Sequence, residues 1–342
     1  MTVYIFIILS SIIFSFLEIM TSIKKNKVFK GIQYIYIFFI IWLYIKNTTR
    51  FDYLEYIRIF ELVPYFPNLE KGYEILIVLL KEINISYLGI LSIASFLFLY
   101  VFFIKYRISY IFSFLLFYFP YYFLYDFPQT RNLIMILIFM LGLSLKANLK
   151  IRFFITFLAS QIHRLGNIYF LYFIIERIKR KYVYLLIIIV NLGVLLFVNY
   201  LPNMLGLIYN KTKVLSYFGN NPINYIAYLY GTLDVVLEIL LVKFICKDSF
   251  KLKNKYERFI VFSLFFIGGG LYNLETIGRI WRNTSFIRFY YYSNIIFKKI
   301  SIKRRLLLLY LLSIKMLIFI LLKFSGKNIQ VFIDLINQLE LK

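Results

Sequence analysis

The chain contains few of the residues that usually carry out acid–base chemistry or bind metal ions. Its 342 residues include one cysteine, Cys246, and one histidine, His163. A single cysteine cannot form a disulfide within the chain, and one histidine without a cysteine cluster cannot complete a tetrahedral zinc site. We therefore expect neither a disulfide-stabilised scaffold nor a zinc enzyme, and we expect no cofactor.

Acidic residues are scarce as well. The sequence has 16 Asp and Glu against 40 Lys and Arg, which gives a formal net charge of +24 at pH 7. It is also 62% hydrophobic, with 39 Phe and 32 Tyr, and a soluble domain of this size could not bury so many apolar side chains in one core. The basic residues lie in short runs between apolar stretches, where they are typical topology signals rather than a nucleic-acid surface. These features predict a lipid bilayer as the main environment and no nucleic-acid partner.

The apolar stretches predict an all-α, polytopic integral membrane protein with about twelve transmembrane helices, because a helix of about 20 apolar residues crosses the hydrocarbon core. The first stretch lacks a basic start and a small-residue cleavage site, so we expect a retained span rather than a signal peptide. We expect a single membrane domain over residues 1–342. The expected spans are 3–20, 32–45, 87–104, 108–125, 131–146, 151–163, 166–178, 182–201, 225–246, 258–275, 285–298 and 305–322.

The basic clusters fall at every second connection between these spans, which places all of them on one side. Short loops rich in Lys and Arg resist translocation, so this side is predicted to be cytoplasmic and both termini are predicted to lie outside. The clusters are Lys24, Lys25, Lys27 and Lys30; Lys105 and Arg107; Lys146, Lys150 and Arg152; Arg177, Lys179, Arg180 and Lys181; Lys247, Lys251, Lys253, Lys255 and Arg258; and Lys298, Lys299, Lys303, Arg304 and Arg305.

Two connections on the outer side are long enough to carry structure. Residues 46–86 contain a short apolar stretch, 73–80, which we interpret as a re-entrant or interfacial helix. Residues 202–224 are rich in Asn, Gly and Pro, which predicts turns and a lid over a site. The tail, residues 323–342, has apolar residues at helical spacing and is predicted to lie as an amphipathic helix on the membrane surface.

Polar residues at the outer helix ends form the first candidate site. Asp52 and Glu70 could each pair with an arginine and hold the outer loop, although they are equally consistent with a solvated loop. Arg131 follows Pro128 and Gln129 at the start of a span, where a guanidinium and free backbone N–H groups can bind an anion such as pyrophosphate. The alternative for Arg131 is an interfacial side chain that reaches the lipid head groups.

His163 and Arg164 lie at another outer helix end, in the run ASQIHRLGN. Histidine readily accepts a proton from a hydroxyl near neutral pH, although a lone histidine at an interface is more often packed than catalytic. Arg279, Arg282 and Arg288 lie near an outer boundary as well, against the positive-inside rule. They are therefore expected to need an anionic partner, either lipid head groups, Glu275 or a substrate phosphate.

A family resemblance joins these segments. The runs RFDYLEY, LEKGYE, FPQTRNLIMILIFMLGLSL, FITFLASQIHRLGNIYFLYF and GRIWRNTSFIRFYYYSN together resemble the EpsG branch of the Wzy-type bacterial polysaccharide polymerases. The most specific part is the pair Gln129 and Arg131 followed by His163 at the end of a span. The resemblance implies an inner-membrane glycosyltransferase that extends O-antigen, capsule or exopolysaccharide. It would transfer the growing glycan from undecaprenyl diphosphate to a fresh lipid-linked repeat unit.

The resemblance also implies roles for individual residues. His163 would be the general base on the acceptor hydroxyl, and a cluster of arginines would hold the diphosphate without a metal ion. The site would face the periplasm or the exterior, and a chain-length regulator is a further partner that this chemistry allows. The candidate substrate-binding residues are Arg131, Arg279, Arg282, Arg288, Gln129, Arg164, Asp52 and Glu70.

Two other functions remain open. An O-antigen ligase would share the outward arginines and the base but use a different acceptor. A flippase for lipid-linked oligosaccharides would need charges inside the membrane, and Asp234 and Glu238, four residues apart on one helix face, are the candidates. These two carboxylates are equally explained by pairing with a buried Lys or Tyr.

Overall fold

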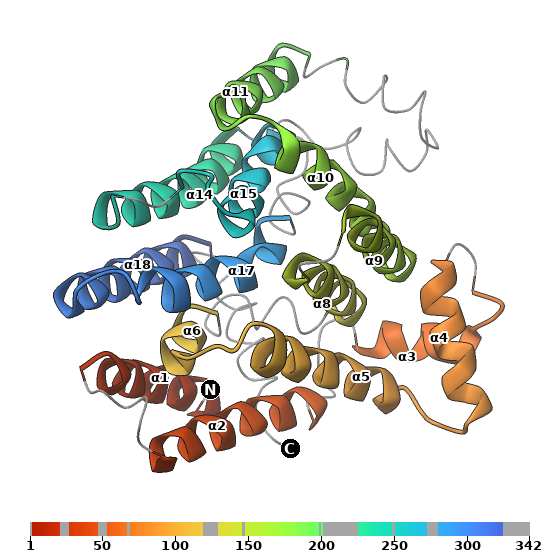
Figure 1. The fold of residues 1–342 in the computed structure, drawn as a ribbon. Coiled ribbons are helices and arrows are strands. Elements are labelled where there is room, and N and C mark those ends of the chain that lie inside the picture. The colour runs from red at the N-terminus through yellow and green to blue at the C-terminus, as the bar shows by residue number, and fades with distance from the viewer. Residues whose placement is uncertain are drawn as a thin grey trace. The chain divides into compact units, whose positions relative to one another are not determined.

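In the computed structural model, every regular element in the described part of the chain is a helix (Figure 1). That part comprises residues 2–20, 27–46, 53–66, 69–118, 129–145, 148–197, 200, 225–247, 250–271 and 280–323. The prediction of an all-α protein is confirmed. The predicted lid at 202–224 lies outside the described residues, as does the predicted tail helix after Lys323.

The helices belong to two compact units. The first comprises Met1–Leu171 together with Ser293–Lys342, and the second comprises Tyr172–Tyr292. The single membrane domain over the whole chain stays a prediction.

The first unit combines helices from both ends of the sequence. They are α1 (Thr2–Met20), α2 (Lys27–Lys46), α3 (Tyr53–Leu62), α4 (Lys71–Glu82), α5 (Leu88–Leu99) with its π-helical continuation η2 (Tyr100–Lys105), α6 (Ile111–Tyr118), α8 (Thr130–Ser144), α9 (Leu149–Ile162), the 3-10 helix η4 (Arg164–Tyr169) and α18 (Ile302–Lys323).

The second unit is built from the central part of the chain. Its helices are α11 (Arg180–Leu196), α14 (Tyr225–Ile245), α15 (Lys255–Phe262), the 3-10 helix η5 (Ser263–Leu271) and α17 (Ser285–Tyr290). Two further helices, α10 (Phe170–Arg177) and the π-helix η6 (Tyr291–Ile296), run across the boundary between the units.

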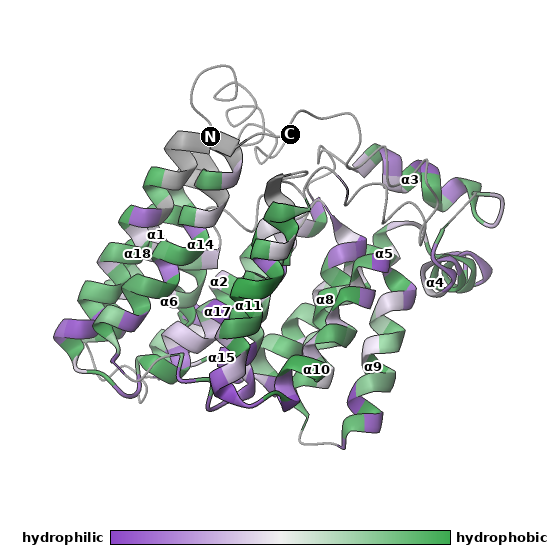
Figure 2. Cartoon of the chain, turned by 90° about the horizontal axis from the view of Figure 1, so that it is seen from above, coloured by the Kyte–Doolittle hydropathy of each residue, from purple (hydrophilic) through white to green (hydrophobic). Residues whose placement is uncertain are grey.

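A helix occupies the described part of every expected span, and four spans each consist of two successive helices. Within the described residues, two helical stretches are long and apolar enough by themselves to cross a membrane: α2 (Lys27–Lys46), and α5 together with its continuation η2 (Leu88–Lys105). Phe6 and Ile13 on α1 are 59% and 60% exposed, and Figure 2 shows hydrophobic residues along most of α1 and α18. Such apolar faces are typical of surfaces that another apolar phase covers. The number of twelve spans stays a prediction.

Glu18 ties three helices of the first unit together. Its Oε1 accepts hydrogen bonds from the Gln33 side chain at 2.7 Å and from the backbone N–H of Phe112 at 3.2 Å. Its Oε2 accepts from the backbone and the hydroxyl of Ser113 at 2.9 and 2.8 Å. Glu18 is 6% exposed, so α1 supplies a buried carboxylate that satisfies the free N–H groups at the start of α6.

The long outer connection contains two helices rather than one. The short apolar stretch at 73–80 lies in α4, whose buried residues Tyr73, Ile77 and Leu80 share one face. The sequence did not predict α3 before it, because its ten residues mix charged and apolar side chains. Figure 2 shows hydrophilic residues on both helices. The helix at 73–80 is therefore present, and its position relative to a bilayer stays a prediction.

A cavity of about 350 Å³ lies in the first unit, near the start of α2. Its lining includes Glu18, Lys30, Gln33, Arg107 and Tyr110. Lys30 and Gln33 stand near the start of α2, whereas the candidate site described below contacts the end of that helix. The cavity is therefore separate from that site, and two residues of the basic clusters, Lys30 and Arg107, line it.

Candidate active site

The start of α8 places Arg131 among tyrosines. Arg131 Nη1 donates a hydrogen bond to Glu70 Oε2 at 2.9 Å. The guanidinium carbon also lies 5.8 and 5.5 Å from the ring centres of Tyr56 on α3 and Tyr73 on α4. A cation this close to aromatic rings is attracted by their negative faces. We refer to Tyr56, Glu70, Tyr73, Arg131 and Arg164 as the Arg131 cluster.

Thr130 fixes the position of Arg131. Thr130 is fully buried, and its hydroxyl lies 3.3 Å from the hydroxyls of Tyr44 on α2 and Tyr87 before α5. These two contacts attach the first turn of α8 to two neighbouring helices. Arg131 is therefore held at its backbone by packing and at its side chain by Glu70, an arrangement that limits its motion.

Glu70 contacts a second arginine through its other oxygen. Glu70 Oε1 accepts a hydrogen bond from the backbone N–H of Arg164 at 3.2 Å and lies 3.9 Å from the Nε atom of the same residue. The side chains of Glu70 and Arg131 are 11% and 22% exposed, whereas that of Arg164 is 54% exposed. One carboxylate thus faces two guanidinium groups, so the residues of the Arg131 cluster together carry a net positive charge, and one of the two cations is accessible.

His163 ends α9 and begins the turn that carries Arg164. Its backbone is extended, and its Nδ1 atom accepts a hydrogen bond from the backbone N–H of Leu165 at 3.1 Å. A neutral imidazole that accepts at Nδ1 carries its proton at Nε2, so in this conformation Nε2 is a donor. A general base that acts through Nε2 would need the other tautomer. The assignment of His163 as the general base stays a prediction.

Two glycines permit the helices around this site to approach closely. A Cβ atom on Gly72 would lie 2.7 Å from Gln161 Cβ and 2.9 Å from the Gln161 carbonyl oxygen on α9. A Cβ atom on Gly166 would lie 2.7 Å from Ser160 Cα. A side chain at either position would overlap α9, so the space beside this helix requires glycine. These contacts bring α4 and the His163 turn against the same helix.

The other predicted residues of the first unit are placed as follows. Gln129 precedes α8 and makes no side-chain cap with it. Asp52 lies outside the described residues, so its predicted pairing with an arginine is not tested. The partner of Glu70, which the sequence left open, is Arg131. Tyr56 and Tyr73 lie in the runs RFDYLEY and LEKGYE, close to Asp52 and Glu70, but the sequence assigned a role in binding to neither tyrosine.

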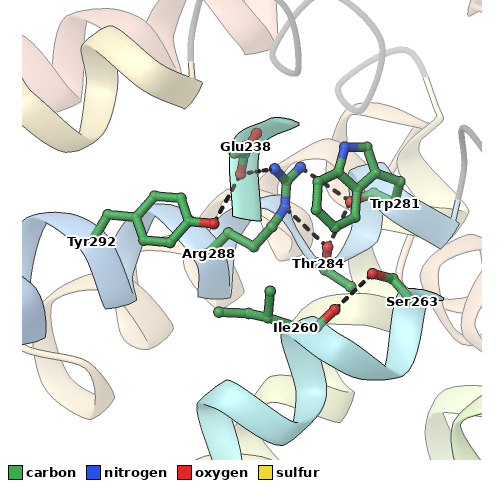
Figure 3. A network of polar contacts seen from close by, with 7 residues as sticks. All are labelled: Glu238, Ile260, Ser263, Trp281, Thr284, Arg288 and Tyr292. Atoms are coloured by element: carbon green, nitrogen blue, oxygen red, sulfur yellow. Dashed lines mark hydrogen bonds and ion pairs between the residues drawn. The ribbon is translucent and has the colours of Figure 1, made fainter. Parts of the chain in front are cut away.

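The second unit contains a buried ion pair between Arg288 and Glu238 (Figure 3). Arg288 is 0% exposed and Glu238 is 1% exposed. Arg288 Nη1 donates to Glu238, Nε donates to the Thr284 hydroxyl at 3.0 Å, and Nη2 donates to the Trp281 carbonyl at 3.3 Å. The Trp281 ring stacks 3.5 Å from the guanidinium carbon, and the Tyr292 hydroxyl donates to Glu238 at 3.0 Å. All three nitrogens of Arg288 therefore already have protein partners.

This pair shows what Glu238 contacts, one of the two carboxylates that the sequence predicts inside the membrane. Glu238 pairs with an arginine and a tyrosine, which agrees with the expected pairing to a buried Tyr and adds a partner that was not expected. Arg282 is 6% exposed in the same segment, and Arg279 lies outside the described residues. A carboxylate held by an arginine and a hydroxyl gives little support to a transporter, which would need an accessible charge along its path.

Comparison with known proteins supplies the family. The family model described as "EpsG family" matches residues 31–335. The chain belongs to the EpsG family. The search of curated proteins and the search of solved structures each gave no match.

Membership of the EpsG family supports a membrane protein of the polysaccharide polymerase type. The matched range contains both the Arg131 cluster and the Arg288–Glu238 pair, whereas Glu18 precedes it. Within the described ranges, no group of three or more His, Cys, Asp or Glu side chains is placed to hold a metal ion.

Proposed function

We propose that this EpsG protein is a glycosyltransferase that polymerises undecaprenyl-diphosphate-linked repeat units into O-antigen, capsule or exopolysaccharide. The reaction would take place on the outer face of the inner membrane. The observation that supports it best is the Arg131 cluster, where one carboxylate orients two arginines beside tyrosine rings and next to the only histidine. The family assignment supports the polymerase class.

The chemistry of the cluster suits a diphosphate leaving group. In the transfer, an oxygen of the acceptor sugar bonds to the anomeric carbon of the donor glycan, and the bond from that carbon to the diphosphate oxygen breaks. The electron pair leaves with the diphosphate, so negative charge grows on its oxygens. Guanidinium groups that are already oriented stabilise such charge at low reorganisation cost. Among the described residues, Arg131 and Arg164 are the arginines that contact Glu70.

The proton of the acceptor hydroxyl also needs a destination. His163 is the candidate base: Nδ1 could take that proton after releasing the Leu165 N–H, whereas Nε2 could take it only after the ring exchanges its tautomer. Tyrosine rings beside the arginine offer flat apolar faces for sugar rings. Arg279 and Arg282 are retained as further diphosphate ligands in the proposal, with Gln129 and Asp52 as weaker ones. The proposal needs no metal ion for charge neutralisation.

A glycan ladder tests the proposal. A strain that lacks the gene is complemented with the wild type, Arg131→Ala or His163→Ala at matched membrane expression, and its lipid-linked glycans are separated by size. The wild type is expected to restore multi-repeat chains, and both variants are expected to leave single repeats. Polymer that accumulates on its lipid carrier in the deletion strain would instead indicate a ligase. A deletion strain with an unchanged ladder would refute polymerisation.

A further inference from the structure

Two hydrogen-bond donors of the Arg131 cluster have no partner among the described residues. They are the hydroxyl of Tyr73 and the Nε atom of Arg131, and both atoms are buried. A buried donor without an acceptor is unfavourable, and such groups are rare in folded proteins. Their side chains touch, because the guanidinium carbon of Arg131 lies 5.5 Å from the centre of the Tyr73 ring. Two unsatisfied donors in adjacent side chains indicate a place that an acceptor group fills.

Tyr73 is well suited to donate. It is 0% exposed, and it lies on the buried face of α4. Burial, reinforced by the neighbouring Tyr87 and Tyr56, raises the pKa of Tyr73 well above its usual value. Its hydroxyl therefore keeps its proton at neutral pH and can only gain from a nearby acceptor. Because no described residue accepts from it, the hydroxyl has no visible structural task.

The acceptor that fits is an anionic oxygen rather than a sugar hydroxyl. A hydroxyl that accepted from Tyr73 and Arg131 would bring a proton of its own, which needs an acceptor. The nearby carboxylate, Glu70, already contacts Arg131 through one oxygen and Arg164 through the other. A phosphoryl group carries oxygens that only accept, and its charge matches the net positive charge of the cluster.

We propose that the Tyr73 hydroxyl and the Arg131 Nε atom bind phosphoryl oxygens of the diphosphate that carries the donor glycan. Tyr73 is then a substrate-binding residue of the polymerase, and this inference rests on the proposed function. Glu70 holds one edge of the Arg131 guanidinium and leaves the Nε edge for the ligand. Tyr56 covers the guanidinium from a second ring.

The substitution Tyr73→Phe isolates this contact. It removes one oxygen atom from a buried ring and keeps the packing of α4 against its neighbours. Since that oxygen has no described protein partner, the melting temperature of the purified full-length protein in nanodiscs should not fall. Tyr36→Phe is the matched control: Tyr36 is also buried, but its hydroxyl contacts Ser10, Ser11 and the Ile7 carbonyl at 2.7 to 3.0 Å. The control should lower the melting temperature and leave ligand binding unchanged.

Binding is measured by calorimetry with two probes, inorganic pyrophosphate and farnesyl diphosphate. Tyr73→Phe is expected to weaken both by about tenfold, which corresponds to the loss of one hydrogen bond to a charged group. An equal factor for both probes assigns the contact to the diphosphate itself. A decrease for farnesyl diphosphate alone would place Tyr73 on the lipid chain and overturn the proposal. So would equal affinities in the wild type and Tyr73→Phe, or a wild type that binds neither probe.

The glycan ladder separates this inference from the proposed function. If Tyr73→Phe gives full-length ladders and unchanged pyrophosphate affinity while Arg131→Ala gives single repeats, the Tyr73 contact is refuted and the polymerase remains. If the deletion strain keeps its ladder, the polymerase is refuted, and pyrophosphate titration still reports whether the two donors bind a diphosphate. Shorter ladders from Tyr73→Phe together with weaker pyrophosphate binding would support both.

Discussion

Glu70 accepts a hydrogen bond from Arg131 at 2.9 Å, although the two residues lie 61 positions apart in the sequence. The same carboxylate accepts from the backbone of Arg164, so it joins the start of α8 to the turn after α9. This junction sets the spacing between the arginine that the sequence marked as an anion ligand and the histidine that it marked as a base. A change at Glu70 should therefore affect both the fold and the chemistry.

The first prediction concerns Glu70→Gln. The variant should lower the stability of the purified protein by ~1–3 kcal/mol, because Arg131 loses its charged partner while remaining largely buried. Polymer length should decrease as well, since Arg131 is no longer oriented. Thermal unfolding in detergent and the glycan ladder measure the two effects. Glu74→Gln is the control on the same helix, because its ion pair with Lys71 is at the surface and should contribute little. Equal effects of both variants would contradict a special role of Glu70.

The second prediction concerns the close approach of α4 to α9. Gly72→Ala adds a Cβ atom 2.9 Å from a backbone oxygen of Gln161, which cannot move without displacing α9. The variant should destabilise the protein and shorten the glycan ladder, because Glu70 and Tyr73 flank position 72. Gly31→Ala on α2 is the control. A Cβ atom there meets nothing within 4 Å, and alanine is the better helix former, so stability should stay unchanged or rise. A Gly72→Ala protein with wild-type stability would show that α4 tolerates a shift.

The sequence predicted much of the helical content because long apolar runs are the strongest pattern that a chain can display. It did not predict α3, which mixes charges with apolar residues, nor that spans such as 87–104 divide into two helices. For the site, it indicated Arg131, Arg164, His163 and Glu70 individually. Their assembly could not be predicted, because contacts across 61 or 94 positions depend on how helices pack.

The contacts of the tyrosines and of the buried ion pair also could not be predicted from the sequence. Tyr73 and Tyr56 lie in the same two runs as Glu70 and Asp52, but their contact with Arg131 depends on how α3, α4 and α8 pack and could not be predicted from the sequence. Arg288 and Glu238 were each identified as costly in a membrane, yet their partners are each other, 50 positions apart. Charges inside apolar segments are thus visible in a sequence, whereas their pairing requires the tertiary structure.

The third prediction concerns Glu18. Glu18→Gln places an amide –NH2 where two oxygens accept four hydrogen bonds, so a donor faces a donor at the start of α6. The loss of stability should be ~1–3 kcal/mol, since buried backbone N–H groups lose their acceptor. Glycan length per folded molecule should not change, because Glu18 precedes the matched family range and contacts Gln33 near the start of α2, whereas Tyr44 near the end of α2 contacts Thr130 beside Arg131. Normal stability of the variant would refute the anchoring role of this carboxylate.

The last prediction separates two roles of Arg288. Arg288→Met alone leaves Glu238 buried without its cation, and it should destabilise the protein by ~3–5 kcal/mol. The double variant Arg288→Met with Glu238→Leu removes both charges and should recover most of that stability, because a buried ion pair contributes little net energy compared with apolar side chains. Since all three guanidinium nitrogens already bond within the second unit, the double variant should also restore the multi-repeat ladder. A double variant that folds like the wild type and still leaves single repeats would instead show that Arg288 leaves Glu238 to bind the diphosphate during transfer.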